Sequence, residues 1–188
     1  MKVIVLPAIL ALAAVSCIPA AAKSNTPATR TQASTAHHDT IFLEKANQGS
    51  VNEIDLAQLA LQKSNNEDVK NFAQKMITDH NTLLNNMKQF DNEAGLQIPS
   101  QPDASAQAEK AKLEALSGEA FDKAYIRAMV RDHHKDLEEF MAEKKATGYP
   151  AFRTAVEQGE QVVREHLQLI DQLAKKNGVA PAPVPAGA

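Results

Sequence analysis

The stretch Phe72-Ala73-Gln74-Lys75-Met76-Ile77-Thr78-Asp79-His80 shows the pattern that decides the fold. Its apolar side chains recur in steps of three and four, and the same spacing continues to Phe90. This spacing puts the side chains on one face of a helix, which must be buried against other helices. Three further segments carry a stripe of the same kind. The four stripes are Phe42, Ala46, Gly49, Glu53, Leu56 and Ala60; Phe72, Met76, His80, Leu83, Met87 and Phe90; Phe121, Tyr125, Met129, His133, Leu137 and Phe140; and Phe152, Val156, Gly159, Val163, His166, Ile170 and Leu173.

Capping residues and helix breakers set the expected helix limits. Asp39 or Thr40 should cap the first helix, and the run Ser64-Asn65-Asn66-Glu67 matches a capping box that opens the second. Ser117 should cap the third long helix, and Pro150 suits the first turn of the fourth. We expect long helices over residues 39–63, 64–94, 117–148 and 150–178, and a short helix over residues 105–116. The predicted fold class is all-α: an antiparallel four-helix bundle with one short extra helix in the central connection.

The first 22 residues have the pattern of an export signal. Met1-Lys2 is positively charged, and the apolar run that follows, about 13 residues long, is too short to span a bilayer. Two cleavage sites are open. Ala20-Ala21-Ala22 before Lys23 suits ordinary signal peptidase, whereas Ala14-Val15-Ser16-Cys17 resembles a lipobox that would leave a lipid on Cys17. Either way, we expect a protein of the periplasm or one attached to the outer membrane, with membrane contact only through such an anchor.

Both ends of the bundle domain are predicted to be unstructured. Residues 23–38 are rich in Ser, Thr, Ala and Gln without periodicity, which indicates a flexible tether. At its end, His37-His38 is interpreted as part of a solvated tail in preference to an adventitious metal contact. Residues 179–188 form a Pro/Ala-rich stretch that predicts a disordered tail. The helical bundle domain should therefore span residues 39–178.

Composition excludes several classes of function. The net charge of −3 and the lack of a basic stripe argue against nucleic-acid binding. Cys17 is the only cysteine, so neither an intrachain disulfide nor a cysteine-based metal site can form. We find no glycine-rich phosphate loop and no serine in a nucleophile elbow. The sequence shows no complete catalytic set, and we expect a protein that is not an enzyme.

One ionisable residue interrupts each apolar stripe. They are Glu53, His80, His133 and His166. From the rise of a helix, all four should lie within roughly 10 Å of the middle of the bundle, where we expect them to approach one another. Each histidine directly follows an acidic residue, and these acids are Asp79, Asp132 and Glu165.

Residues 72–80 and 125–133 are weakly similar to each other. Both end in Asp-His, and both carry a methionine at the same place. The similarity is consistent with an old duplication of a helical hairpin and equally with two core helices that share common needs.

Four motifs together resemble a known family. They are Phe42-Leu43-Glu44-Lys45-Ala46, Met76-Ile77-Thr78-Asp79-His80, Ala128-Met129-Val130-Arg131-Asp132-His133 and Arg164-Glu165-His166-Leu167. In this order they are similar to small exported bacterial proteins grouped as domain of unknown function 4142, often labelled outer-membrane proteins. The resemblance covers about residues 40–175. It implies a ferritin-like helical bundle and no established activity.

The di-iron chemistry of ferritin-like bundles does not fit this sequence. Such sites use Glu-x-x-His pairs, whereas the residues three before the histidines are Ile77, Val130 and Val163. A different metal site remains open, in which Glu53 and two or three of the histidines hold one zinc, copper or iron ion. Asp79, Asp132 or Glu165 could then orient the rings. The alternatives are a buried polar network that fixes packing, or histidines that lie at the edge of the core.

Two functions from different classes follow. The favoured hypothesis is a non-enzymatic protein of the cell envelope that acts through its helical surface, for example under stress. The alternative is a metal-binding or redox ferritin-like protein that uses the central Glu/His cluster and a transition-metal ion.

Overall fold

The computed structural model describes the backbone of residues 27–180 and the side chains of residues 36–180. Five helices and no strands are present in this part of the chain, which confirms the all-α fold class. The helices are α1 (Pro27–Lys63), α2 (Glu67–Ala94), α3 (Ala104–Glu114), α4 (Gly118–Ala146) and α5 (Pro150–Lys176). None of the described helices is both long and apolar enough to cross a bilayer.

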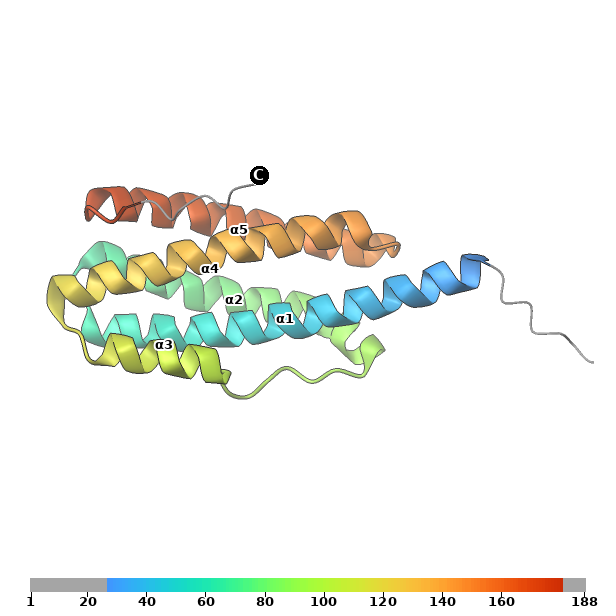
Figure 1. Ribbon diagram of the computed structural model, residues 1–188, viewed down its shortest axis with the longest axis horizontal. Helices are drawn as coiled ribbons and strands as arrows, with labels where there is room; N and C mark the ends of the chain where they lie inside the picture. The colour runs from blue at the N-terminus through green and yellow to red at the C-terminus, as the bar shows by residue number, and fades with distance from the viewer. Residues whose placement is uncertain (1–26, 181–188) are drawn as a thin grey trace, which may run out of the picture.

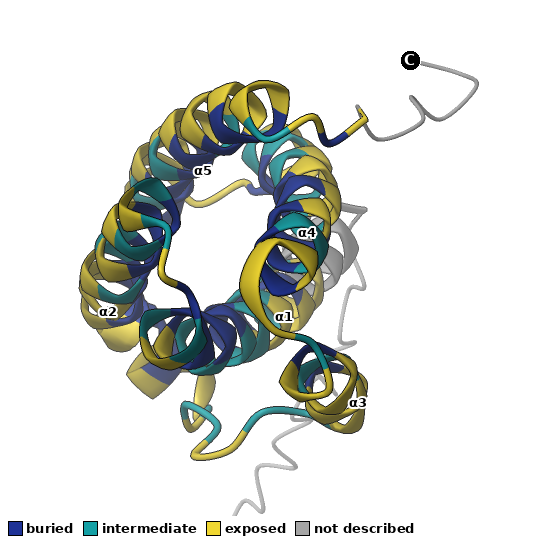
Figure 2. Cartoon of the chain, turned by 90° about the vertical axis from the view of Figure 1, so that its left-hand side faces the viewer, coloured by how far each residue is buried: buried dark blue, intermediate teal, exposed yellow. Residues whose placement is uncertain are grey.

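Four of the helices form a closed ring in the order α1, α2, α5 and α4. Figure 1 shows that neighbours in this ring run antiparallel. The connection after α2 carries the chain back along the bundle, so that α4 starts at the end where α1 finishes. The short helix α3 belongs to this connection and lies outside the ring, against α1 and α4 (Figure 2). The result is a ferritin-like four-helix bundle with one short extra helix.

The first helix begins at Pro27 instead of Asp39. The prediction of a flexible tether is therefore wrong for residues 27–38. Pro27 fits the first position of a helix, and no glycine or further proline interrupts the chain before Asp39. The hydroxyl of Thr40 donates to the carbonyl of Ala36, which is a contact made inside a helix and not at its cap. The cleavage and lipidation sites fall in residues 1–26, outside the described residues.

The second helix is capped differently from the prediction. Its N-cap is Asn66, whose side chain accepts a hydrogen bond from the amide of Asp68. Ser64 is therefore not the cap of a capping box. Its hydroxyl instead donates to Asp122 on α4, which ties the first hairpin to the opposite pair of helices.

Helix ends elsewhere follow the expected signals. Ser117 is the N-cap residue of α4, and Pro150 opens α5. Gly178 has a φ of 63°, and the amide of Val179 donates to the carbonyl of Ala174. Val179 is buried in the core, so the prediction that the tail starts at residue 179 is wrong for that residue. Residues 181–188 lie outside the described part.

The core has two apolar clusters, one toward each end of the bundle. The first contains Leu56, Ala57, Leu59, Ala60, Val69, Phe72, Ala73, Met76, Leu113, Phe121, Tyr125, Ile126, Ala128, Met129, Val130, Ile170, Leu173, Ala174 and Val179. The second contains Phe42, Leu43, Leu83, Met87, Phe90, Phe140, Phe152, Val156 and Val163. On each ring helix, the ionisable stripe residue falls between the two clusters along the sequence. A polar layer therefore separates two apolar halves of the core.

Candidate metal centre

Four helices each contribute one side chain to the polar layer. Glu53 comes from α1, His80 from α2, His133 from α4 and His166 from α5. Each of these side chains is at most 4% exposed. The structure brings all four together, as the spacing of the stripes predicted.

Glu53 lies between two of the histidines. Its Oε2 is 3.1 Å from Nε2 of His80, and its Oε1 is 3.3 Å from Nδ1 of His133. Neither contact is aligned as a hydrogen bond, and among the described residues both carboxylate oxygens and Nε2 of His80 have no hydrogen-bond partner. These are strongly polar atoms held in the interior without the partners that burial normally demands.

The rings of His133 and His166 face each other through one nitrogen each. Nε2 of His133 lies 3.3 Å from Nδ1 of His166. On the far side of its ring, Nδ1 of His133 lies 2.9 Å from the backbone carbonyl oxygen of Met129. On the far side of the other ring, Nε2 of His166 lies 2.8 Å from Oδ2 of Asp79. Each ring is therefore oriented from behind by an oxygen acceptor.

His80 completes a three-histidine group. Its ring lies 5.3 Å from that of His166 and 6.1 Å from that of His133, measured between centroids. Nδ1 of His80 is 3.3 Å from the hydroxyl of Ser50. One ring nitrogen from each of the three histidines falls within 4.8 Å of the others. That clustering is what a single metal ion requires of its ligands.

Comparison with known proteins places the chain in a family. The model of a family described as Domain of unknown function (DUF4142) matches residues 24–173. The chain belongs to this family. No match was found among curated proteins. The chain is also similar to the crystal structure of a DUF305 protein from Streptomyces coelicolor, described as secreted. The TM-score is 0.67 at 13% identity, with 79% of this chain and 97% of that chain covered, which shows a shared fold.

Burial makes the histidines of this DUF4142 protein weak bases. It lowers the pKa of His80 well below its ordinary value, with a further lowering from the other two rings. Burial also lowers the pKa of His133, and it outweighs the opposite effect of Asp136. Burial and then His133 lower the pKa of His166 to about 4. All three imidazoles are therefore neutral at pH 7, which is the form that binds metal ions.

The two carboxyl groups next to the histidines behave differently. Burial raises the pKa of Glu53 well above its ordinary value, and the charge of Asp132 raises it further. Burial works in the same direction on Asp79, but hydrogen bonds from Lys75 and His166 outweigh it and lower the pKa of that group. Asp79 is thus ionised at neutral pH and accepts a hydrogen bond from the His166 ring, whereas Glu53 resists ionisation in the absence of a cation.

The acids that precede the histidines do not act alike. Asp79 contacts a histidine ring, although it is the ring of His166 on α5 and not that of its neighbour His80. Asp132 instead pairs with Arg131, and exposed Glu165 lies near Lys75. The expectation that these two orient a ring is therefore wrong for the described structure. Adjacent side chains on a helix diverge by about 100°, so an acid beside an inward histidine points sideways or outward.

Several contributors were missed by the sequence reasoning. They are Ser50, Tyr125, Met129 and Asp136. Two of them could have been found, because Ser50 stands three residues before Glu53 and Asp136 three residues after His133, and such spacing shares a helix face. The residue pattern does not indicate the contact of the Met129 carbonyl, nor that the buried Tyr125 hydroxyl has no hydrogen-bond partner among the described residues.

A polar groove between α1, α3 and α4 leads to this centre. It has a volume of about 700 Å³ and reaches Glu53. Its walls include Asp132, Asp136 and Glu139 from α4. Burial, followed by the charge of Glu53, raises the pKa of Asp136 well above its ordinary value. The groove runs from the surface to the carboxyl group beside the histidines, and its walls carry basic as well as acidic side chains, the basic ones being Lys45, Lys112, Arg131 and Lys135.

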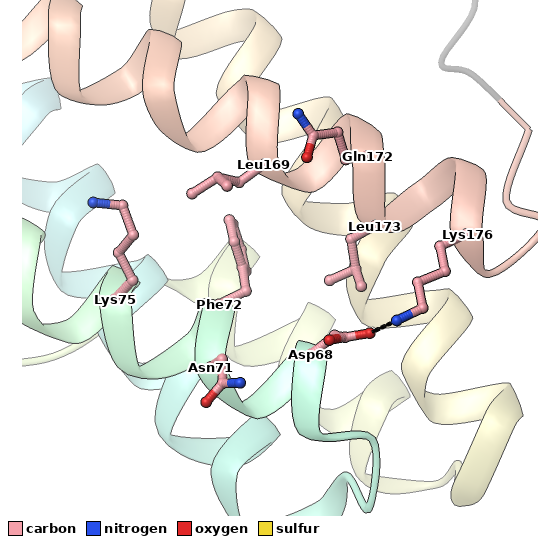
Figure 3. Close-up of a pocket in the computed structure, with 8 residues that line it drawn as sticks. All are labelled: Asp68, Asn71, Phe72, Lys75, Leu169, Gln172, Leu173 and Lys176. Atoms are coloured by element: carbon pink, nitrogen blue, oxygen red, sulfur yellow. Dashed lines mark hydrogen bonds and ion pairs between the residues drawn. The ribbon is translucent and has the colours of Figure 1, made fainter.

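On the opposite side the centre is closed by Phe72. Its ring packs edge-on at 6.2 Å from the rings of both His133 and His166. Phe72 also lines a shallow groove of about 350 Å³ between α2 and α5, together with Leu169 and Leu173 (Figure 3). The Asp68–Lys176 ion pair bounds this groove at one end. Phe72 therefore separates the groove from the histidine rings.

Proposed function

We propose that this protein is an exported, non-enzymatic protein of the bacterial envelope that binds one transition-metal ion at His80, His133 and His166. The observation that carries the proposal is the 3.3 Å distance between Nε2 of His133 and Nδ1 of His166. Both nitrogens face the same small space, and both belong to neutral rings.

The proton on each ring is assigned by its outer partner. A carbonyl oxygen can only accept, so Nδ1 of His133, opposite the Met129 carbonyl, carries the hydrogen. The ionised Asp79 likewise accepts from Nε2 of His166. The two nitrogens that face each other then both present lone pairs. Two lone pairs at this distance repel each other unless a proton or a metal ion lies between them.

The spacing suits a metal ion. Zinc–nitrogen bonds are about 2.0–2.1 Å long, so two ligands at a tetrahedral angle stand about 3.3 Å apart. The Met129 carbonyl and Asp79 are the kind of outer partners that metal-bound histidines usually have. Three neutral imidazoles with an adjacent carboxyl group favour zinc, copper or iron over magnesium or calcium.

Export is supported by two independent observations. The first 22 residues have a positively charged start, an apolar run and small residues at the two alternative cleavage sites. The structurally similar DUF305 protein is described as secreted. Metal binding in the envelope, without a catalytic set, favours holding or buffering an ion over transforming a substrate.

The test is to count bound ions on the exported protein, purified without a histidine tag. Elemental analysis and calorimetric titration with Zn²⁺ and Cu²⁺ should show that His133→Ala and His166→Ala each bind one ion fewer than the wild type. His134→Ala is the matched control, because His134 is the exposed next residue on α4. Equal ion counts in His133→Ala, His134→Ala and the wild type would disprove the proposal.

A second candidate is a purely structural polar layer. It is favoured by the neutral state that burial imposes on Glu53 and the three histidines, because a neutral cluster needs no counter-ion. In that case His80→Ala would destabilise the fold, and added metal would leave the melting temperature of every variant unchanged.

A further inference from the structure

A second group of ionisable side chains lies where α1, about three turns after its start, meets the end of α4. His38 and Asp39 come from α1, and Glu143 comes from α4. One ligand atom from each of the three lies within 4.8 Å of the others. Nδ1 of His38 is 2.5 Å from Oε2 of Glu143. The group is separated from the central histidines by the apolar cluster that contains Phe42 and Phe140.

Glu143 is the most deeply buried member of this group. Its side chain is 1% exposed, whereas that of His38 is 54% exposed. Neither carboxylate oxygen of Glu143 has an aligned hydrogen-bond partner among the described residues, and the same holds for Oδ1 of Asp39. A buried acidic side chain without an aligned partner among the described residues thus lies next to an exposed histidine.

Asp39 is held in place from behind. The hydroxyl of Thr147 donates to Oδ2 of Asp39 at 3.0 Å and accepts from the amide of Tyr149. Thr147 is itself 1% exposed, and its amide donates to the carbonyl of Glu143. One buried threonine therefore fixes both the Asp39 carboxylate and the end of the helix that carries Glu143. Outer partners of this kind are typical of carboxylates that bind cations.

The charges in this group do not balance. No lysine or arginine among the described side chains pairs with Asp39 or Glu143, and their one basic partner there is the imidazole of His38. Two carboxyl groups this close to each other, one of them on a buried side chain without an aligned partner among the described residues, are stabilised by a shared proton or by a bound cation.

We propose that His38, Asp39 and Glu143 form a second cation site, which binds a divalent first-row ion such as Mn²⁺ or Zn²⁺. Two carboxylates and one imidazole supply two hard oxygen ligands and one nitrogen ligand, a set that suits these ions. The exposed side next to His38 leaves room for water to complete the coordination. The site differs from the central one, where three nitrogen ligands are buried.

The experiment uses Mn²⁺ as the probe, because its electron paramagnetic resonance signal counts free ions directly. Mn²⁺ is titrated into the exported protein, purified without a histidine tag, up to millimolar concentrations. His38→Ala and Glu143→Gln should each lose one bound Mn²⁺ per chain. His37→Ala and Glu138→Gln are the matched controls, since both residues are exposed neighbours on the same two helices. Both controls should bind as the wild type does.

One further variant separates this site from the central one, and a measurement of helix content serves as a check on folding. His133→Ala should keep the Mn²⁺ that His38→Ala loses, so failure of the central site would leave this result intact. His38→Ala truncates a side chain that is more than half exposed, and its far-ultraviolet circular dichroism should match that of the wild type. The proposal is overturned if the wild type binds no Mn²⁺, or if His38→Ala and Glu143→Gln bind as much as their controls.

Discussion

The ring of Phe140 on α4 lies directly against the backbone of Gly159 on α5. A β-carbon at position 159 would come within 2.3 Å of Cε1 of Phe140 and 3.1 Å of Cδ1 of Leu83. Two helices can approach this closely because glycine has no side chain. We therefore expect Gly159→Ala to destabilise the protein by about 1–3 kcal/mol, as overpacking usually does. Urea denaturation followed by circular dichroism measures this loss.

Gly49 on α1 provides the matched control. A β-carbon there would meet nothing within 4 Å. Because glycine weakens the interior of a helix, Gly49→Ala should stabilise the fold by about 0.5–1 kcal/mol. If Gly159→Ala is as stable as Gly49→Ala, the close packing of α4 against α5 does not require glycine at position 159.

Tyr125 carries a buried hydroxyl without a partner among the described residues. Burial raises the pKa of this phenol far above its ordinary value, and the charge of Glu53 adds to the effect. Removing an unsatisfied buried polar group should help the fold, so Tyr125→Phe is expected to raise the free energy of unfolding by about 1 kcal/mol. Tyr149→Phe, at a side chain that is 43% exposed, should change nothing. A loss of stability in Tyr125→Phe would reveal a partner for the hydroxyl.

Asp103 should make the docking of α3 sensitive to acid. Its carboxylate accepts hydrogen bonds from Ser105, from the amide of Ala106 and from Asn52 on α1, which lower its pKa to about 2. A carboxyl group with a lowered pKa stabilises the folded state above its unfolded pKa of about 3.9. This contribution is lost as the pH falls through about 2.

The measurement compares the wild type with Asp103→Ala. At pH 7 the variant should lose about 1 kcal/mol of stability, as expected for a missing N-cap. The difference between the two proteins should shrink as the pH falls from about 4 to about 2. A difference that stays constant over this range would show that the charge of Asp103 contributes nothing.

Metal binding at the central histidines should raise the melting temperature. An ion that binds only the folded state at 100 times its dissociation constant adds about 2.7 kcal/mol, or about 5–10 °C for a chain of this size. Differential scanning calorimetry measures the rise in melting temperature on addition of Zn²⁺. In His133→Ala this rise should be smaller, because the ion at the central histidines no longer binds. Asp79→Asn should retain binding with an affinity about 10–100-fold weaker, because it loses the orienting acceptor of His166. An unchanged affinity in Asp79→Asn would show that Asp79 does not contribute to metal binding.

The two alternatives at the N-terminus give different products. If Cys17 carries lipid, Cys17→Ala should move the protein from the membrane fraction to the soluble periplasmic fraction. If cleavage follows Ala22, Cys17→Ala should fractionate as the wild type does, and N-terminal sequencing should begin at Lys23. Cell fractionation with sequencing of the mature chain distinguishes the two.

The sequence predicted the bundle well because one signal was repeated four times. Each apolar stripe fixes which face of its helix is buried, and the ionisable residue in each stripe has to lie at the same depth as its neighbours. This is why Glu53 and His166, 113 residues apart in the chain, could be placed in one cluster before the structure was known. The start of the last helix at Pro150 was predicted for a similar reason, since the backbone geometry of the first helical turn restricts the residue type.

Features that depend on contacts between helices could not be predicted. Helix geometry alone turns Asp79 away from its neighbour His80, but its contact with His166 depends on how α2 packs against α5, which the sequence of α2 alone does not contain. The helix over residues 27–38 was not predicted, because the polar composition of this segment is compatible with a helix and with a flexible tether. Because the helix was predicted to start at Asp39, the contact of His38 with Glu143 could not be predicted.

The early start of α1 has a mechanical consequence. Residues 27–37 rise about 1.5 Å each along the helix axis, so they carry the chain about 16 Å before His38 meets Glu143 of the bundle. A flexible linker of that length would let the bundle reorient independently of the residues that precede it. A continuous helix instead acts as a lever: a tilt or torque applied at Pro27 is carried along the same helix to Ser50 and Glu53. Pulling on the N-terminal side of this protein would therefore load the apolar contacts of Phe42 and Leu43 first, and through the same helix the layer that contains Glu53.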